Sequence, residues 1–105
     1  MIVGTATGST GYSLSAGGPI LLPTSSDVVL TPICPHQLSA RPIVVTKDDI
    51  VTLKMVSEAR GQQTRAMMTI DGQVSYPIKT DSTINIKTRN KKLKFIVFDE
   101  EVFYR

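Results

Sequence analysis

Apolar and polar residues alternate along much of this chain, in short runs separated by turn-forming residues. Val51, Leu53 and Met55 fall on one face of their segment, and the residues between them are polar. Ile84 and Ile86 alternate with polar neighbours in the same way. A period of two is typical of a strand that has one face on a core and the other in water. These two segments therefore predict half-buried strands.

Further short apolar runs predict the remaining strands. In the last of these runs, Leu93, Phe95 and Val97 line one face while Ile96 and Phe98 line the other, so this strand is expected to be covered on both sides. The other runs lie over residues 1–4, 28–30, 43–45, 64–70 and 73–78. The two prolines within residues 31–36 exclude a central strand there.

Two turns join these predicted strands. Arg60-Gly61-Gln62 supplies one of them. Asp71-Gly72 is a strong hairpin signal, because a type I′ turn needs positive φ at both central residues. The hairpin also explains Asp71 without a catalytic role. Six or seven short strands at this spacing predict a mainly β fold, a layered β-sandwich-like architecture with one short helix, in a single domain over residues 1–105.

One segment near the N-terminus departs from the β pattern. Residues 5–11 hold only small side chains and are expected to form a loop. Ser9 or Thr10 is a candidate N-cap for a short helix over about residues 10–16, and Gly17-Gly18-Pro19 ends it. A strand, a loop of small residues and a helix start, in that order, suit an anion such as phosphate. The segment is neither a P-loop nor a dinucleotide fingerprint, so a plain connector is the alternative.

Composition narrows the function classes. The 105 residues carry 12 Lys+Arg against 9 Asp+Glu, and 41% are hydrophobic, which is typical of one ordered globular domain. The basic residues within 87–94 are interpreted as a solvated hairpin end, with anion binding as the alternative. No apolar stretch is long enough to span a membrane, and no signal peptide is expected. Cys34 is the single cysteine, so neither an internal disulfide nor a cysteine metal cluster can form, which favours the cytoplasm.

Three strings resemble the NAD kinase family. Residues 5–20, TATGSTGYSLSAGGPI, resemble its second signature, and residues 30–42, LTPICPHQLSARP, resemble a later conserved segment. Asp71-Gly72-Gln73 matches the family's Asp-Gly-Gln hairpin and follows in family order. Ala6 and Gly11 stand where Pro and Ala are common in the family, and both are small enough to preserve the loop. The resemblance implies the closing portion of the family's β-rich C-terminal domain.

NAD kinases transfer the terminal phosphoryl group of ATP, or of polyphosphate in some members, to the 2′-hydroxyl of the adenosine ribose of NAD. The resemblance therefore implies NAD as substrate and ATP or polyphosphate with Mg²⁺ in the complete enzyme. The family's Gly-Gly-Asp-Gly and Asn-Glu motifs do not occur in this chain. We expect no catalytic residue here, no activity of the chain alone, and an upstream N-terminal kinase domain as partner.

The resemblance also implies site residues. The NAD-contacting run comprises Thr10, Gly11, Tyr12, Ser13 and Ser15. Hydroxyl groups would come from Thr10 and Ser15, the ring of Tyr12 would pack on the dinucleotide, and Leu14 is expected to face the core.

Three residues further along the chain are candidates for the wall of the pocket. Cys34 either lines it or is a small buried hydrophobe. His36 makes either a structural hydrogen bond or a ligand contact, and it has no partners for a metal site. Gln73 follows the hairpin turn and is a further candidate for dinucleotide contact.

Two other functions fit the same residues. The chain could be a non-catalytic β-module or degenerate paralogue of the family, or a relative of the lipid kinases in the same superfamily. The intact strings at residues 5–20 and 30–42 favour NAD. Exposed strand edges predict a homo-oligomer, and neither nucleic acid nor a membrane is an expected partner.

Overall fold

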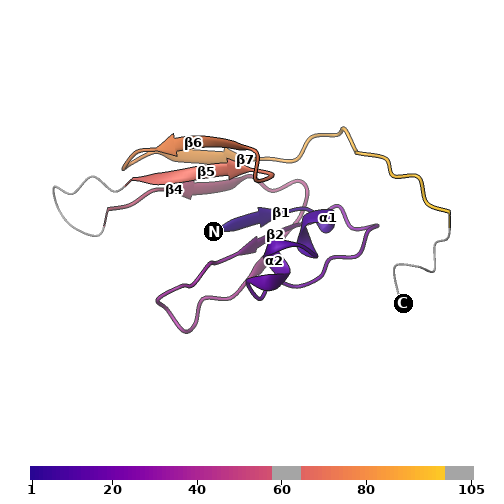
Figure 1. Ribbon diagram of the computed structural model, residues 1–105, viewed down its shortest axis with the longest axis horizontal. Helices are drawn as coiled ribbons and strands as arrows, with labels where there is room; N and C mark the ends of the chain where they lie inside the picture. The colour runs from indigo at the N-terminus through magenta and orange to yellow at the C-terminus, as the bar shows by residue number, and fades with distance from the viewer. Residues whose placement is uncertain (58–64, 99–105) are drawn as a thin grey trace.

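The computed structural model describes residues 1–57 and 65–98, and the predicted turn at residues 60–62 lies outside them. The described residues form two short helices and seven strands, so the predicted mainly β fold is confirmed (Figure 1). The strands are β1 Ile2–Gly4, β2 Val28–Thr31, β3 Ile43–Val45, β4 Val51–Lys54, β5 Ala66–Ile70, β6 Val74–Ile78 and β7 Thr83–Ile86. The helices are α1 Ala6–Ser9 and α2 Tyr12–Ser15.

The first layer is a three-stranded antiparallel sheet in the order β1-β2-β3. The central strand β2 pairs on both sides, so that Val29 lies opposite Gly4 of β1 and Val44 of β3. Val29 is fully buried and Val28 nearly so, and these two side chains form the core of the layer. The apolar run in β2 therefore reflects a strand that is covered on both faces.

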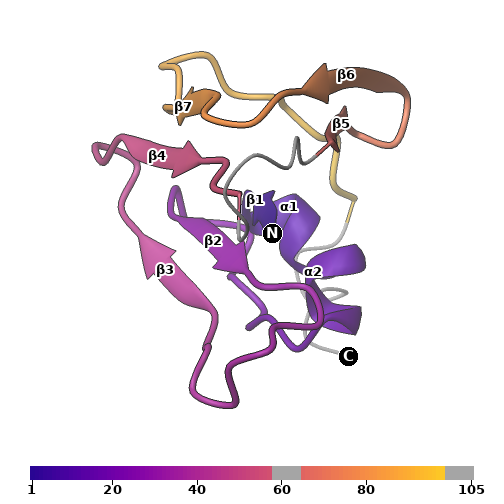
Figure 2. The same ribbon diagram turned by 90° about the vertical axis from the view of Figure 1, so that its left-hand side faces the viewer.

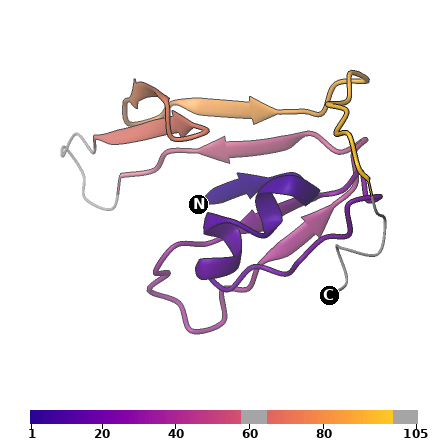
Figure 3. The same cartoon turned by 45° about the vertical axis from the view of Figure 1, so that its right-hand side comes forward.

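Both helices pack against this sheet, with α1 contacting β1 and β2, and α2 contacting β1. A second layer, built from two antiparallel pairs, lies above it (Figures 1 and 3). The pair β4–β7 places Val51 opposite Ile86 and Leu53 opposite Ile84. These side chains are half-buried while their neighbours are exposed, which confirms the period of two in both segments. The turned view of Figure 2 shows β4 of the second layer above β2 and β3 of the first.

The second antiparallel pair is the β5–β6 hairpin, and its turn follows the Asp-Gly prediction. Asp71 has φ 50° and Gly72 has φ 68°. The backbone N–H of Gln73 donates to the carbonyl oxygen of Ile70 at 3.0 Å and closes the turn. The positive φ values are those of a type I′ turn, so the explanation of Asp71 as a turn residue is supported.

The N-terminal helix differs from its prediction. A helix was expected over about residues 10–16 with Ser9 or Thr10 as its N-cap; instead α2 spans Tyr12–Ser15, its N-cap is Gly11, and no side chain caps it. Residues 6–9, expected to be part of a loop, form the additional helix α1. Hydrogen bonding explains the difference. The Ser9 hydroxyl donates to the carbonyl oxygen of Ala6, three residues earlier, and therefore does not cap the helix that follows. The end of α2 is as predicted, since Gly17 has φ 87°.

The predicted strand over residues 93–98 is wrong. This segment is described but belongs to no strand, and its apolar side chains are exposed. A strand needs a neighbour for its N–H and C=O groups, and no described strand pairs with it. Among residues 1–57 and 65–98, no helix is both long enough and apolar enough to cross a membrane.

Candidate functional site

The segment from β1 to the end of α2 makes two tight reversals. The chain leaves β1 at Gly4, turns once through α1, and turns again through α2 after Gly11. The N–H of Gly18 then donates to the carbonyl oxygen of Ser13 at 2.8 Å, while Gly17 takes the left-handed conformation that ends the helix. Residues 10–15, which we name the hydroxyl turn, are thereby held between β1 and the loop that leads to β2.

The inner side of the hydroxyl turn is fixed by buried hydroxyl groups. Ser13 Oγ and Thr31 Oγ1 lie 2.7 Å apart in a buried hydrogen bond, and both residues are fully buried. Ser9 Oγ donates to the carbonyl oxygen of Ala6 at 2.6 Å and accepts the N–H of Leu21 at 3.0 Å. In the described part of the chain, no buried side-chain nitrogen or oxygen atom lacks a partner. These hydroxyl groups therefore stabilise the turn and are not available to a ligand.

Gly18 allows this close packing. A Cβ atom at Gly18 would lie 2.5 Å from Thr31 Oγ1, 2.9 Å from the Ser13 carbonyl oxygen, and closer still to Ser13 Oγ. These separations are shorter than real Cβ contacts, so no other residue fits without a shift. From the sequence, Gly18 was expected only to help end a helix. Its packing role could not be predicted, because it depends on Thr31, which is 13 positions away along the chain.

The outer side of the hydroxyl turn faces water. Thr10, Gly11, Tyr12 and Ser15 are all exposed, and Tyr12 is 65% exposed. The Thr10 hydroxyl donates to the carbonyl oxygen of Thr7 at 3.3 Å, which is a long bond that a ligand can replace. The exposed residues of the turn thus include two hydroxyl groups, the Gly11 backbone and one aromatic ring. Such a surface can bind a ligand that has both a flat ring and polar oxygen atoms.

Two residues of the turn differ from their predicted placement. Ser13 belongs to the predicted ligand-binding run, but its side chain is fully buried and bonded to Thr31, so it supports the turn from inside. Leu14 was expected to face the core, and it is 42% exposed. A four-residue helix has too few turns to bury a full apolar stripe, so only one of its side chains reaches the sheet.

The candidates for a pocket wall lie on other elements. Cys34 and His36 are exposed in the segment after β2, and among the described residues neither side chain makes a hydrogen bond. The buried alternative for Cys34 and the structural hydrogen bond for His36 are therefore not found. Gln73 is exposed in the turn between β5 and β6, in the other layer. No hydrogen bond within the described residues joins these three side chains to the hydroxyl turn.

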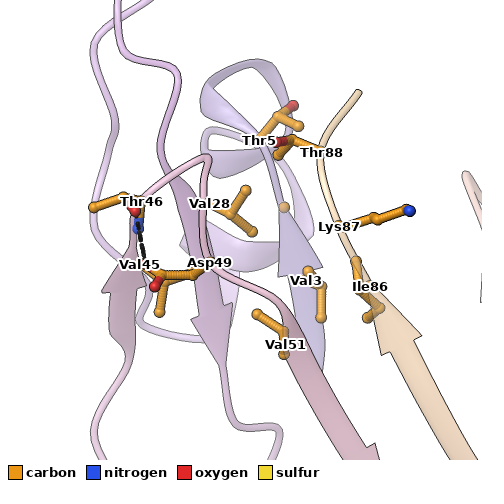
Figure 4. Close-up of a pocket in the computed structure, with 11 residues that line it drawn as sticks. Val3, Thr5, Val28, Val45, Thr46, Asp49, Val51, Ile86, Lys87 and Thr88 are labelled. Atoms are coloured by element: carbon orange, nitrogen blue, oxygen red, sulfur yellow. Dashed lines mark hydrogen bonds between the residues drawn. The ribbon is translucent and has the colours of Figure 1, made fainter. Parts of the chain in front are cut away.

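A separate cavity of about 210 Å³ lies between the two layers (Figure 4). Its lining is mostly apolar and comes from β1 to β4 and β7, including Val3, Val28 and Ile86. Asp49 lies at its rim and accepts hydrogen bonds from the hydroxyl and the backbone N–H of Thr46, both at 2.8 Å. These bonds, the one from the hydroxyl first, lower the pKa of the Asp49 carboxyl below its usual value. No motif in the sequence indicated this turn.

Within residues 1–57 and 65–98 there is no group of three His, Cys, Asp or Glu side chains that could hold a metal ion. The described residues form a two-layer β domain that exposes a turn of hydroxyl, glycine and aromatic residues.

The comparisons with known proteins agree with the strings in the sequence. The profile of the ATP-NAD kinase C-terminal domain matches residues 1–98, so this chain belongs to that family. The NAD kinase of Lachnoclostridium phytofermentans is 40% identical over 104 residues, which cover 99% of this chain and 36% of that protein.

Two further relatives give the same result. The NAD kinase of Caldanaerobacter subterraneus subsp. tengcongensis is 44% identical, and the match covers 99% of this chain and 35% of that protein. The NAD kinase of Flavobacterium johnsoniae is 39% identical, and the match covers 100% of this chain and 34% of that protein. The chain thus spans about a third of the length of the curated relatives it matches.

Proposed function

We propose that this chain is the NAD-binding C-terminal portion of an NAD kinase, an enzyme that phosphorylates the 2′-hydroxyl of the adenosine ribose of NAD to give NADP. The observation that carries the proposal is the exposed side of the hydroxyl turn, within a chain that belongs to the ATP-NAD kinase C-terminal domain family. ATP or polyphosphate is the proposed phosphoryl donor, with Mg²⁺ on its phosphates.

In this proposal the exposed residues of the hydroxyl turn hold NAD. The Tyr12 ring packs against a flat part of the dinucleotide, and the hydroxyls of Thr10 and Ser15 bond its polar oxygen atoms. Gly11 lets the backbone approach the ligand closely. Ser13 keeps the turn in place through Thr31, so its contribution to binding is indirect.

Phosphoryl transfer depends mostly on positioning and on charge stabilisation, with a base or orienting group for the nucleophile. We assign positioning of NAD to this chain and no base, because Asp71 is used by the hairpin turn. We assign no metal ligand to its described residues, since they contain no suitable cluster. The chain alone is therefore proposed to be inactive, and catalysis needs the N-terminal kinase domain.

Cys34, His36 and Gln73 are proposed as secondary contacts in the assembled enzyme. All three are exposed, which leaves them free to line a pocket that another domain or subunit completes. The two outer strands of the first sheet, β1 and β3, each have one unpaired edge among the described strands, which supports a homo-oligomer. A chain with a single, exposed cysteine suits the reducing cytoplasm.

A chimera tests the proposal. This chain replaces the matching third of the Caldanaerobacter NAD kinase, and NADP formation is measured as kcat/KM for NAD. We expect activity, and we expect Tyr12→Ala to lower kcat/KM by about tenfold, because aromatic stacking on a base contributes about 1–3 kcal/mol. Tyr76→Ala is the matched control, since Tyr76 is an exposed tyrosine on β6. A folded chimera without activity, or equal losses for both variants, would contradict the assignment.

A further inference from the structure

Thr31 is the last residue of β2, and its hydroxyl joins this strand to the hydroxyl turn. Thr31 Oγ1 and Ser13 Oγ lie 2.7 Å apart, although the two residues are 18 positions apart in the chain. Within residues 1–57 and 65–98, this is the only side-chain hydrogen bond between α2 and β2. The bond therefore connects two segments of the chain that would otherwise be placed independently.

Both members of this hydroxyl pair are fully buried. Their oxygen atoms meet against the backbone of Gly18, where an added Cβ atom would lie 2.5 Å from Thr31 Oγ1. When a buried hydrogen bond loses one partner, the remaining polar group is left unsatisfied, and this costs more than the bond itself contributes. Loss of the Thr31 hydroxyl would thus leave Ser13 Oγ buried without its partner, and the turn would have to shift to satisfy it.

The segment that follows Thr31 carries two of the candidates for the pocket wall. Cys34 and His36 come three and five residues after Thr31. Pro32 and Pro35 lie in the same stretch, and each proline ring fixes its own φ near −65°. Because this stretch has few free dihedral angles, the position of Thr31 largely determines where Cys34 and His36 lie.

We propose that Thr31 is a positioning residue for NAD binding. Its bond to Ser13 holds the hydroxyl turn and residues 32–36 at the spacing that the dinucleotide bridges. The inference rests on the proposed function, because these two segments are the surfaces that we assign to NAD. Thr31 is buried, so it acts only through Ser13 and through the strand that it ends. Loss of its hydroxyl should weaken NAD binding and leave phosphoryl transfer nearly unchanged.

Steady-state kinetics of the chimera with the Caldanaerobacter enzyme test this role. Thr31→Val removes the hydroxyl and keeps a β-branched side chain that suits a strand. We expect KM for NAD to rise about fivefold to tenfold while kcat changes by less than about twofold, because binding is lost equally in the ground and transition states. Thr31→Ser restores a hydroxyl and should bring KM back to within about twofold of the parent.

Thr52→Val is the matched control. The Thr52 hydroxyl also bonds across to another strand, donating to Asn85 Oδ1 at 2.9 Å, but it lies in the other layer and is exposed. Its loss should leave KM unchanged. Thermal unfolding shows that each variant is folded at the assay temperature, so a merely structural role of Thr31 would leave KM at the parent value. If Thr31→Val does not fold, Ser13→Ala breaks the same bond from the turn, and the same rise in KM is expected.

A double-mutant cycle with Tyr12→Ala tests whether Thr31 acts through the turn. If it does, Thr31→Val should raise KM much less in a chimera that already carries Tyr12→Ala. Effects that simply multiply would contradict the proposal. An unchanged KM in folded Thr31→Val, or an equal rise in Thr52→Val, would also overturn it.

Amide signals in the NMR spectrum of the isolated chain give a readout that needs no NAD. Thr31→Val should shift the signals of residues 10–15 together with that of His36, and Thr52→Val should shift neither. Signals of residues 10–15 that stay in place would contradict the link. The proposed function fails separately, because it requires Tyr12→Ala to lower kcat/KM, whereas an active Tyr12 with a silent Thr31→Val contradicts the positioning role alone.

Discussion

At the residue scale, small and hydroxyl side chains carry the candidate site. The hydroxyl turn has two sides: Ser13 bonds Thr31 in the interior, while Thr10, Tyr12 and Ser15 face water. In the sequence these residues form one continuous string, and nothing in the string separates the supporting residues from the exposed ones. The separation comes from the partner, Thr31, which the sheet brings to Ser13.

Gly18→Ala tests the inner side of the turn. The new Cβ atom would press on Ser13 Oγ and Thr31 Oγ1, so we expect the free energy of unfolding to fall by about 1–3 kcal/mol. Urea denaturation measures it. Gly8→Ala is the control, because a Cβ atom at Gly8 meets nothing within 4 Å and should leave stability nearly unchanged. Equal effects of the two substitutions would contradict the packing role of Gly18.

Asp49 gives a prediction about pH. Its pKa is lowered in the folded chain by the Thr46 hydroxyl and backbone N–H, so the ionised carboxylate favours folding. This contribution is present above the unfolded-state pKa of about 3.9 and is lost as pH falls through the folded pKa. Asp49→Asn should therefore lower stability at pH 7 and differ less from the parent chain near pH 3.

Denaturant unfolding at both pH values measures this difference. Asp48→Asn is the matched control, since it removes the neighbouring carboxylate and leaves the Thr46 bonds in place. A difference between Asp49→Asn and the parent that is as large at pH 3 as at pH 7 would show that the charge is not involved.

At the element scale, short-range signals predicted the strands well and the helices poorly. Alternation located β4 and β7, and the Asp-Gly pair located the β5–β6 turn, because strand faces and positive φ values are decided by local residue types. Each helix has only four residues, so long-range contacts such as the Leu21 N–H on Ser9 Oγ decide where it forms. Residues 93–98 were predicted to form a strand because their side chains suit one, and no described strand pairs with them.

The hairpin offers the clearest element-scale prediction. Asp71 has φ 50°, which Asn tolerates and a β-branched residue does not. We expect Asp71→Asn to leave the free energy of unfolding within about 0.5 kcal/mol of the parent, and Asp71→Val to lower it by about 1–2 kcal/mol. Thermal unfolding compares them. A chimera carrying Asp71→Asn should also keep its NAD kinase activity, and a large loss of activity without a loss of stability would indicate a catalytic Asp71.

At the scale of the whole molecule, the chain is a two-layer β domain that spans about a third of the length of the relatives it matches. The family could be predicted from the sequence because its strings at residues 5–20 and 30–42 are long and specific, and the family match over residues 1–98 agrees with them. The geometry of the pocket could not be predicted. Cys34, His36 and Gln73 lie on elements that make no hydrogen bond to the hydroxyl turn within the described residues. In the proposed function, surfaces beyond this domain would bring these three residues into one site.

The most direct test of the central claim is an NMR titration of the ¹⁵N-labelled chain with NAD. Because this chain supplies only part of the pocket, we expect weak binding, with a Kd near 1 mM, or about −4 kcal/mol. The amide shifts should concentrate at Thr10, Gly11, Tyr12 and Ser15, should leave residues 93–98 unchanged, and should be lost in Tyr12→Ala. Shifts that spare the hydroxyl turn, or that persist unaltered in Tyr12→Ala, would contradict the account.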